Sequence, residues 1–249
     1  MAQTVPMKIS SPTLACAAFF AATTASADCV VLLHGLARGT ASLAVMEEAL
    51  QASGYDTVNI GYPSTEFQFE RLVEMAVPPA VEACGDTPVH FVSHSLGGIL
   101  ARAWLQENRP AKMGHVVMMA PPNHGSELVD VFGDLGAFEW LNGPTGVALG
   151  TGDESIPNSL GAARFTLGVI AGNQSLNPLY SFLIEGPDDG KVSVSSTVVA
   201  GLDDHIVLPV THTFMMNDPL VIRQTLEFLK TGKFDKDLTL LDVMREMIE

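Results

Sequence analysis

The sequence predicts an α/β fold with a mostly parallel sheet of about six strands and helices on both of its faces. Short runs rich in branched aliphatic residues alternate with helical patterns, which is typical of parallel strands joined by crossover helices. The 249 residues are enough for one such domain with a buried core and few for two. Hydrophobic residues make up 47 % of the chain and charged residues 16 %, a balance that argues against disorder.

Six short apolar runs are expected to be the strands. Val30 to Leu33 is apolar throughout, as is typical of a strand buried on both faces. The predicted strands cover residues 30–33, 57–60, 89–92, 115–119, 165–170 and 206–208.

Helical patterns separate these runs. The first helix is expected to begin at Thr40 or Ser42 as its N-cap and to end at Gly54. The pattern of residues 67–83 is also helical, but the pair Pro78-Pro79 inside it is expected to kink or break the helix.

Three later helices follow from similar signals. Residues 99–106 belong to the helix after the third strand. Another helix is expected to begin at the Asn217-Asp218 cap with Pro219 in its first position, and to end near Gly232. The residues after Phe234 fit one more amphipathic helix.

Residues 121–164 interrupt the alternation of strands and helices. They are expected to hold about one helix, residues 127–141, followed by a glycine-rich passage. Inserts of this length in α/β enzymes are usually functional. Because this insert is apolar, one interpretation is a helical lid over an acyl-binding cleft; the other is that its apolar residues only pack the insert onto the domain.

The first 27 residues have the features of a signal peptide. Lys8 supplies a positive charge, the apolar run 14–22 follows, and Ala25-Ser26-Ala27 resembles a cleavage site. The apolar run is too short to span a bilayer, so no stable membrane anchor is expected. Residues 28–249 are then a single exported domain, periplasmic or extracellular.

The charge of the chain narrows the choice of partners. Against 13 Lys and Arg there are 28 Asp and Glu, which gives a formal net charge of −15. Such a surface repels phosphate backbones and gives no attraction to anionic lipid headgroups. We therefore expect a small-molecule substrate and no nucleic acid.

Ser95 is the candidate nucleophile. The buried strand 89–92 leads directly into Ser93-His94-Ser95-Leu96-Gly97-Gly98 and then into a helix, the strand–turn–helix context of a nucleophile elbow. The turn projects the hydroxyl above the sheet, where a base can take its proton. Glycine is common two positions before and after such a serine. Here Gly97 provides the second position, and the small residue Ser93 stands in the first.

Acyl transfer also requires N–H donors for the developing oxyanion. Leu96 offers one, because it follows the nucleophile at the start of a helix. His34-Gly35-Leu36 follows the first strand, and its turn presents the N–H of Leu36 as the second donor. The position of His34 in this loop suggests a structural hydrogen bond.

These motifs resemble the α/β-hydrolase fold and, within it, the secreted bacterial lipases and esterases. The segment 120–126, which follows the fourth predicted strand, is also similar to a segment of those lipases. The resemblance covers nearly all of residues 29–232 and implies a minimal version of the fold that lacks the two usual leading strands. It also implies the chain order serine, acid, histidine.

That order selects the base and the acid. His212 follows the last predicted strand and precedes the final helix, where the family's histidine lies, with His205 as the alternative. The resemblance places the acid after the fifth strand, at Asp189, with the adjacent Asp188 as the close alternative. The carboxylate would orient the imidazole and stabilise its charged form.

Two cysteines remain after the signal peptide, Cys29 and Cys84. In the fold that this chain resembles, the strands that follow them lie side by side and parallel, so both cysteines belong at one edge of the sheet. We expect them to form a disulfide, as oxidising compartments favour.

The expected activity is that of a serine carboxylic-ester hydrolase, a lipase or esterase with an acyl-enzyme intermediate and the triad Ser95, Asp189 and His212. An acyltransferase or thioesterase with the same triad is an alternative, as is a non-catalytic binding protein on this fold. No cofactor is expected, and no cluster of metal ligands stands out in the sequence. The natural substrate and the oligomeric state are left open.

Overall fold

The computed structural model describes residues 27–246 together with Met1 and Ile248. Apart from Met1 and Ala27, the predicted signal peptide lies outside the described residues.

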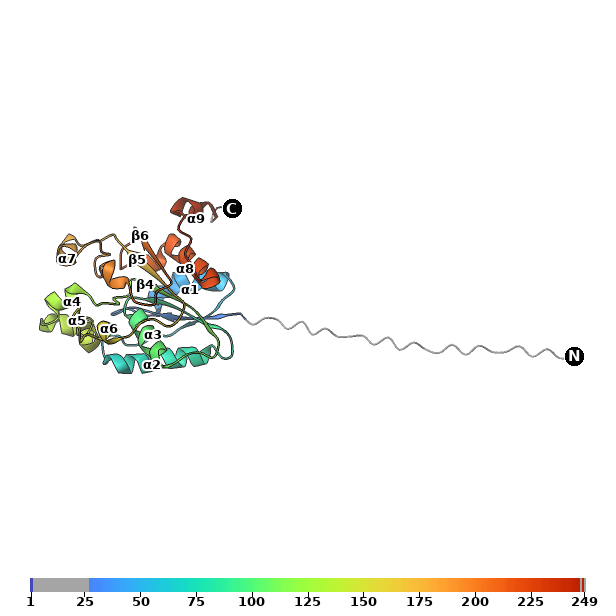
Figure 1. Ribbon diagram of the computed structural model, residues 1–249, viewed down its shortest axis with the longest axis horizontal. Coiled ribbons are helices and arrows are strands. Elements are labelled where there is room, and N and C mark those ends of the chain that lie inside the picture. Colours follow the sequence, from blue (N-terminus) through green and yellow to red (C-terminus); the bar gives the residue numbers. More distant parts are fainter. Residues whose placement is uncertain (2–26, 247, 249) are drawn as a thin grey trace.

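A six-stranded parallel sheet forms the centre of the molecule (Figure 1), as the sequence predicts. Its strand order is β2-β1-β3-β4-β5-β6. The strands are β1 (Cys29–Leu33), β2 (Asp56–Asn59), β3 (Val89–His94), β4 (Met113–Met119), β5 (Leu167–Gly172) and β6 (Asp204–Leu208).

Helices cover both faces of this sheet. The α-helices are α1 (Ala44–Ala52), α2 (Phe69–Ala83), α3 (Leu96–Glu107), α4 (Glu127–Phe132), α5 (Gly136–Val147), α6 (Ile156–Ser159), α7 (Pro178–Leu183), α8 (Pro219–Thr231) and α9 (Leu240–Glu246). Three short 3₁₀ helices are η1 (Thr40–Leu43), η2 (Ser195–Thr197) and η3 (Met215–Asn217).

The alternation of side chains along β1 builds two cores. Val31 and Leu33 face the core beneath α2 and α3, whereas Val30 and Leu32 face the core beneath α1 and α8. Every residue of β1 is buried, which explains why its sequence is apolar throughout. Burying each such side chain contributes about 1.5–3 kcal/mol to the stability of the fold. The two cores therefore hold the sheet rigidly, and the sheet positions the loops at its carboxyl edge.

The predicted ends of α8 are confirmed. The side chain of Asp218 accepts hydrogen bonds from the N–H groups of Leu220 and Val221, with Pro219 in the first turn. Gly232 ends the helix with φ of +75°, a left-handed conformation that glycine adopts without strain. The amphipathic helix expected after Phe234 is also present, as α9.

Two expectations about helices are wrong. α2 continues through Pro78-Pro79. Both prolines lie on its exposed face, where water can hydrate the carbonyls that lose their N–H donors. Neither Thr40 nor Ser42 caps the first helix with its side chain, because that segment forms the 3₁₀ turn η1.

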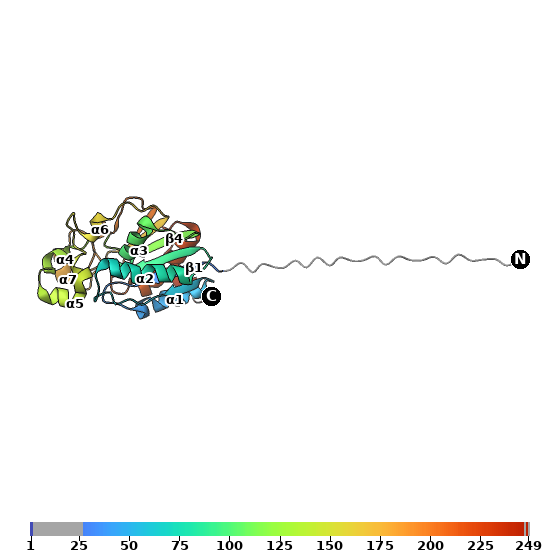
Figure 2. The same cartoon turned by 90° about the horizontal axis from the view of Figure 1, so that it is seen from below.

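The insert also differs from the expected single helix over residues 127–141. It contains α4 and α5, separated by Gly133-Asp134-Leu135, and α5 continues to Val147 across a kink at Gly143, where φ is +70°. A Cβ at Gly143 would lie 1.9 Å from the carbonyl oxygen of Thr65, so this kink requires glycine. Helices α4, α5 and α7 gather at one end of the molecule (Figure 2).

The predicted disulfide is present. Cys29 begins β1 and Cys84 caps the C-terminus of α2, and their Cα atoms are 5.6 Å apart in the bonded pair. Within the described residues, none of the helices is both long and apolar enough to cross a membrane.

Candidate active site

The loops at the carboxyl edge of the sheet bring the sequence-predicted residues to one cavity. Leu36 follows β1, Ser95 follows β3, and His212 follows β6; all three line a cavity of about 590 Å³. Ligand sites of open α/β sheets lie at this edge. Asp189 lies behind His212, in the loop between β5 and β6.

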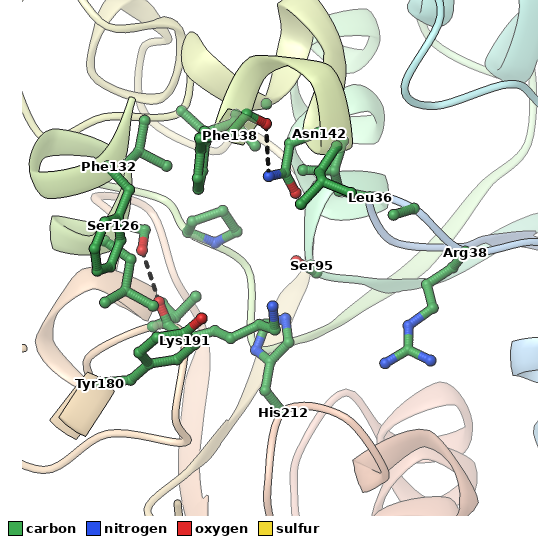
Figure 3. A pocket seen from close by; sticks show the side chains of 18 of the residues that line it. Leu36, Arg38, Ser95, Ser126, Phe132, Phe138, Asn142, Tyr180, Lys191 and His212 are labelled. Carbon is green, nitrogen blue, oxygen red and sulfur yellow. Dashed lines mark hydrogen bonds between the residues drawn. The ribbon is translucent and has the colours of Figure 1, made fainter. Parts of the chain in front are cut away.

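The turn at Ser95 has the strained geometry of a nucleophile elbow. Its φ and ψ are +53° and −123°, outside the regions that side-chain-bearing residues prefer. The turn is fixed because the N–H of Ser95 donates to the carbonyl of Met119, at 2.9 Å. In Figure 3 the side chains of Ser95 and His212 face the same cavity.

Small residues around the elbow permit its close packing. A Cβ at Gly97 would lie 2.3 Å from the carbonyl oxygen of Leu33, so α3 can approach β1 only with glycine there. Ser93 replaces the glycine usual before the nucleophile and is fully buried. A Cβ at Gly98 would lie 3.3 Å from the Ser93 hydroxyl, so Gly98 leaves the space that this serine fills.

His212 and Asp189 form a buried pair. Nδ1 of His212 lies 2.7 Å from Oδ2 of Asp189, and the two residues are 5 % and 2 % exposed. The other oxygen of Asp189 accepts hydrogen bonds from the N–H groups of Lys191 and Val192, at 3.0 and 2.9 Å. Because a carboxylate only accepts, Nδ1 carries the proton in the neutral imidazole and Nε2 is left as the basic nitrogen.

The neighbouring Asp188 has a different role. Its Oδ1 accepts hydrogen bonds from the Ser181 hydroxyl at 2.9 Å and from the N–H of Gly190 at 2.7 Å. These contacts tie α7 to the turn that carries Asp189. Of the two adjacent carboxylates, only Asp189 contacts His212 in the described structure.

His205, the alternative base, and His124, at the start of the insert, make structural contacts. His205 lies near the amino end of β6, and its Nε2 is 2.9 Å from the Thr197 hydroxyl. His124 opens the insert, and its Nδ1 lies 2.7 Å from Oδ1 of Asn158. Neither residue lines the cavity at Ser95.

The loop after β1 is braced by His34. Its ring stacks on Tyr62 with centroids 3.9 Å apart, and its Nε2 accepts from the Tyr62 N–H at 3.3 Å. Burial lowers the pKa of His34, which favours this neutral, accepting form. The structural role expected for His34 is therefore confirmed.

The two expected oxyanion donors lie on either side of the elbow. A Cβ at Gly35 would lie 2.9 Å from Nδ1 of His94 and 3.2 Å from the Cβ of Ser95, so glycine brings this loop against the elbow. No hydrogen-bond acceptor among the described residues takes the N–H of Leu36 or of Leu96. Both N–H groups are therefore without an acceptor in the described part of the chain.

His94 is a site residue that the sequence interpretation did not assign. It is fully enclosed, and its Nε2 lies 2.9 Å from the backbone carbonyl of His212. A carbonyl only accepts, so Nε2 donates and fixes the loop of His212. Burial, and then the neighbouring His212, hold the pKa of His94 well below its usual value, so the ring is neutral. The sequence feature that could have indicated this role is the position of His94 directly before Ser95.

The cavity has an apolar wall and two positive charges. The wall is formed by large side chains of the insert, namely Leu128, Val129, Phe132, Leu135, Phe138, Leu141 and Leu149. Arg38 and Lys191 line the same cavity (Figure 3). Sequence patterns did not single out either cation, because each lies in an irregular loop.

No group of three or more His, Cys, Asp or Glu side chains in the described part of the chain is arranged to hold a metal ion. The arrangement instead offers a hydroxyl on a strained turn, an imidazole paired with a buried carboxylate, and unoccupied N–H donors. These are the groups that acyl transfer through a covalent intermediate requires.

Comparisons with known proteins agree with this architecture. A sequence model described as the alpha/beta hydrolase fold matches residues 28–160. No curated protein sequence matches the chain.

Several solved structures share its fold. The mature lipase BlEst2 of Bacillus licheniformis is 18 % identical with a TM-score of 0.64, over 82 % of this chain and 92 % of that one. Lipase B of Aspergillus fumigatus is 17 % identical with a TM-score of 0.63, over 87 % of this chain and 56 % of that one. A metagenomic carboxyl esterase is 17 % identical with a TM-score of 0.58, over 76 % and 65 %. At identities this low, the likeness concerns the fold alone.

Proposed function

This chain belongs to the alpha/beta hydrolase fold family, and we propose that within it the protein is a carboxylic-ester hydrolase of the lipase or esterase kind. The fold hosts many chemistries, so the proposal depends on the site rather than on the fold. The observation that carries it is the buried His212–Asp189 pair, at 2.7 Å, beside the strained turn of Ser95.

In the proposed mechanism Ser95 attacks the ester carbonyl while Nε2 of His212 takes its proton. The carbonyl oxygen becomes an oxyanion and accepts hydrogen bonds from the N–H groups of Leu36 and Leu96. Collapse of this intermediate breaks the bond to the alcohol, which leaves with the proton from His212. Water then attacks the acyl-enzyme by the same route, which releases the acid and restores Ser95.

Asp189 keeps His212 ready for this proton transfer. The N–H groups of Lys191 and Val192 hold one of its oxygens, and the other accepts from Nδ1. The negative charge stabilises the imidazolium that forms during each attack, and the proton stays on the histidine.

The apolar wall supports an ester with an aliphatic acyl chain. Leu135 and Leu141 line the cavity and yet are 55 % and 60 % exposed, so this part of the wall is open to solvent. A bound acyl chain would cover these side chains, at a gain of about 25 cal/mol for each Å² of apolar surface removed from water. We propose that the insert, residues 121–164, acts as a lid of this cavity.

The test is hydrolysis of p-nitrophenyl esters from acetate to palmitate. The wild-type protein is expected to be active, and Ser95→Ala to lower kcat by about 10⁶. Ser53→Ala is the matched control, because Ser53 caps α1 far from the cavity and is exposed. If folded wild-type protein cleaves no ester of the series, or if Ser95→Ala keeps its activity, the proposal is wrong.

We also propose that the protein is exported and that residues 28–249 form its mature domain. The Cys29–Cys84 disulfide supports this, because such bonds persist in oxidising compartments. N-terminal sequencing of the protein from its native host is expected to begin at Asp28. A chain that retains residues 1–27 inside the cell would contradict this proposal.

A further inference from the structure

The charged residues that line the cavity have the opposite sign to the net charge of the chain. Acidic residues outnumber basic ones by 28 to 13, yet both charged residues that line the cavity, Arg38 and Lys191, are basic. Neither forms an ion pair with a carboxylate among the described residues. Both side chains are exposed to solvent, and the charged groups that line the cavity beside Ser95 are therefore both positive.

This arrangement is unfavourable in the empty protein. Desolvation in the cavity, and then the positive charge of Arg38, lower the pKa of Lys191, whereas the carboxylate of Asp189 acts in the opposite direction. Both cations also help to lower the pKa of His94, directly behind the nucleophile. Two like charges that face one cavity repel each other, and an anion placed between them would relieve that repulsion.

Hydrogen bonds anchor the backbone that carries each cation. Ala37, directly before Arg38, has φ of +52°, and its N–H donates to the buried hydroxyl of Ser64 at 3.0 Å. The N–H of Lys191 donates to Asp189 at 3.0 Å, and its carbonyl accepts from the hydroxyl of Ser126 at 2.7 Å. The two side chains therefore leave the backbone from fixed points, on the loops after β1 and β5.

Arg38 and the apolar wall occupy different parts of the cavity, whereas Lys191 begins on the side of the wall, near Tyr180. In Figure 3 Arg38 lies on one side of Ser95, whereas Phe132 and Phe138 of the insert lie on the other. Lys191 extends along the floor toward His212. An ester bound at Ser95 with its acyl chain on the apolar wall would direct its alcohol part toward Arg38.

From this geometry, and on the basis of the proposed esterase activity, we propose that the natural substrate is an anionic ester. Its alcohol part carries a carboxylate or phosphate group, which Arg38 and Lys191 bind, and its acyl part is an aliphatic chain. The planar guanidinium of Arg38 can donate two parallel hydrogen bonds to either group, and Lys191 adds a point charge.

The test compares matched anionic and neutral esters with the same octanoyl chain. Octanoyl glycolate carries a carboxylate where octanoyl glycolamide carries a neutral carboxamide, and octanoyl lysophosphatidate differs from 1-octanoylglycerol only by its phosphate. Release of octanoate gives kcat/KM for each, and the ratio of anionic to neutral ester is the readout. A general loss of activity affects both members of a pair and cancels in this ratio.

We expect Arg38→Gln and Lys191→Gln each to lower the ratio about tenfold, which corresponds to about 1.4 kcal/mol. Lys230→Gln makes the same change of charge on the exposed side of α8 and is expected to leave the ratio unchanged. For the wild-type protein, raising NaCl from 0.02 to 0.5 M is expected to lower the ratio, because salt screens the attraction. This salt dependence requires no variant.

An effect in the phosphate pair alone identifies a phosphate ester as the substrate class, and an effect in the carboxylate pair alone identifies a carboxylate. The anionic substrate is refuted if the neutral esters are cleaved but the kcat/KM ratios of both pairs are unchanged by the two substitutions and by salt. The esterase proposal stands in that case. If none of the four esters is cleaved although p-nitrophenyl esters are, the anionic substrate is refuted; if neither set is cleaved, the proposed esterase activity itself fails.

Discussion

Replacing Asp189 by asparagine removes one negative charge while keeping the shape of the side chain. The N–H groups of Lys191 and Val192 donate to one oxygen of Asp189, so an asparagine will turn its carbonyl oxygen toward them. Its NH₂ group then faces Nδ1 of His212, where the carboxylate oxygen lies at 2.7 Å. An NH₂ group donates, so it stabilises the tautomer with the proton on Nε2, and the base loses its free lone pair.

The expected cost is large because two contributions are lost together: the correct tautomer and the charge that stabilises the imidazolium. The corresponding substitution in a serine-protease triad lowers kcat by about 10⁴, or about 5 kcal/mol of transition-state stabilisation. We expect Asp189→Asn to lower kcat on p-nitrophenyl butyrate by this amount. Urea unfolding should show that the variant remains folded.

Asp188→Asn is a matched control, one residue away and with the same change of charge. Asp188 accepts from the Ser181 hydroxyl and the Gly190 N–H through a single oxygen, a role that an asparagine carbonyl also fills. Its kcat is expected to stay within threefold of wild type. The reasoning is refuted if Asp188→Asn loses as much activity as Asp189→Asn, or if Asp189→Asn stays within tenfold of wild type.

Three further predictions concern stability, each measured by urea unfolding. Replacing Cys29 and Cys84 by alanine releases a loop with a sequence separation of 55; the chain-entropy model predicts a loss of about 4 kcal/mol, and an unchanged midpoint would contradict it. Gly97→Ala places a methyl group 2.3 Å from a backbone oxygen and should cost at least about 3 kcal/mol, whereas Gly152→Ala meets nothing within 4 Å and should be tolerated. His94 has a lowered pKa in the folded state, so below pH 6.5 the unfolded chain binds more protons. The free energy of unfolding should therefore fall by up to about 1.4 kcal/mol per pH unit below pH 6.5, with a flatter profile in His94→Asn; equal slopes would exclude His94 as a cause.

The strands β1, β3 and β5 could be predicted because each is a short run, mostly apolar, that is buried along its whole length. The run that begins at Val30 predicts β1 almost to the residue, and the Asp218-Pro219 cap predicts the start of α8. The continuity of α2 could not be predicted in this way. Whether Pro78-Pro79 break a helix depends on the face that they occupy, and that face is set by the packing of α2 on the sheet.

The same limit applies to the site. The resemblance to secreted lipases reduced the acid to two adjacent candidates, but which of the two carboxylates faces His212 depends on the fold of this turn, in which Gly190 has φ of +93°. The contact between His94 and His212 joins residues 118 positions apart, so no local pattern contains it. The two cations line one cavity only because the loops after β1 and β5 meet at the carboxyl edge of the sheet.

Reaction with a fluorophosphonate tests most directly whether Ser95 is the nucleophile. This reagent phosphonylates a serine that a histidine activates, and peptide mapping by mass spectrometry locates the adduct. We predict one adduct per chain, on Ser95, and none on folded Ser95→Ala. A folded wild-type protein that forms no adduct, or forms it on another serine such as Ser93, would contradict the proposed mechanism.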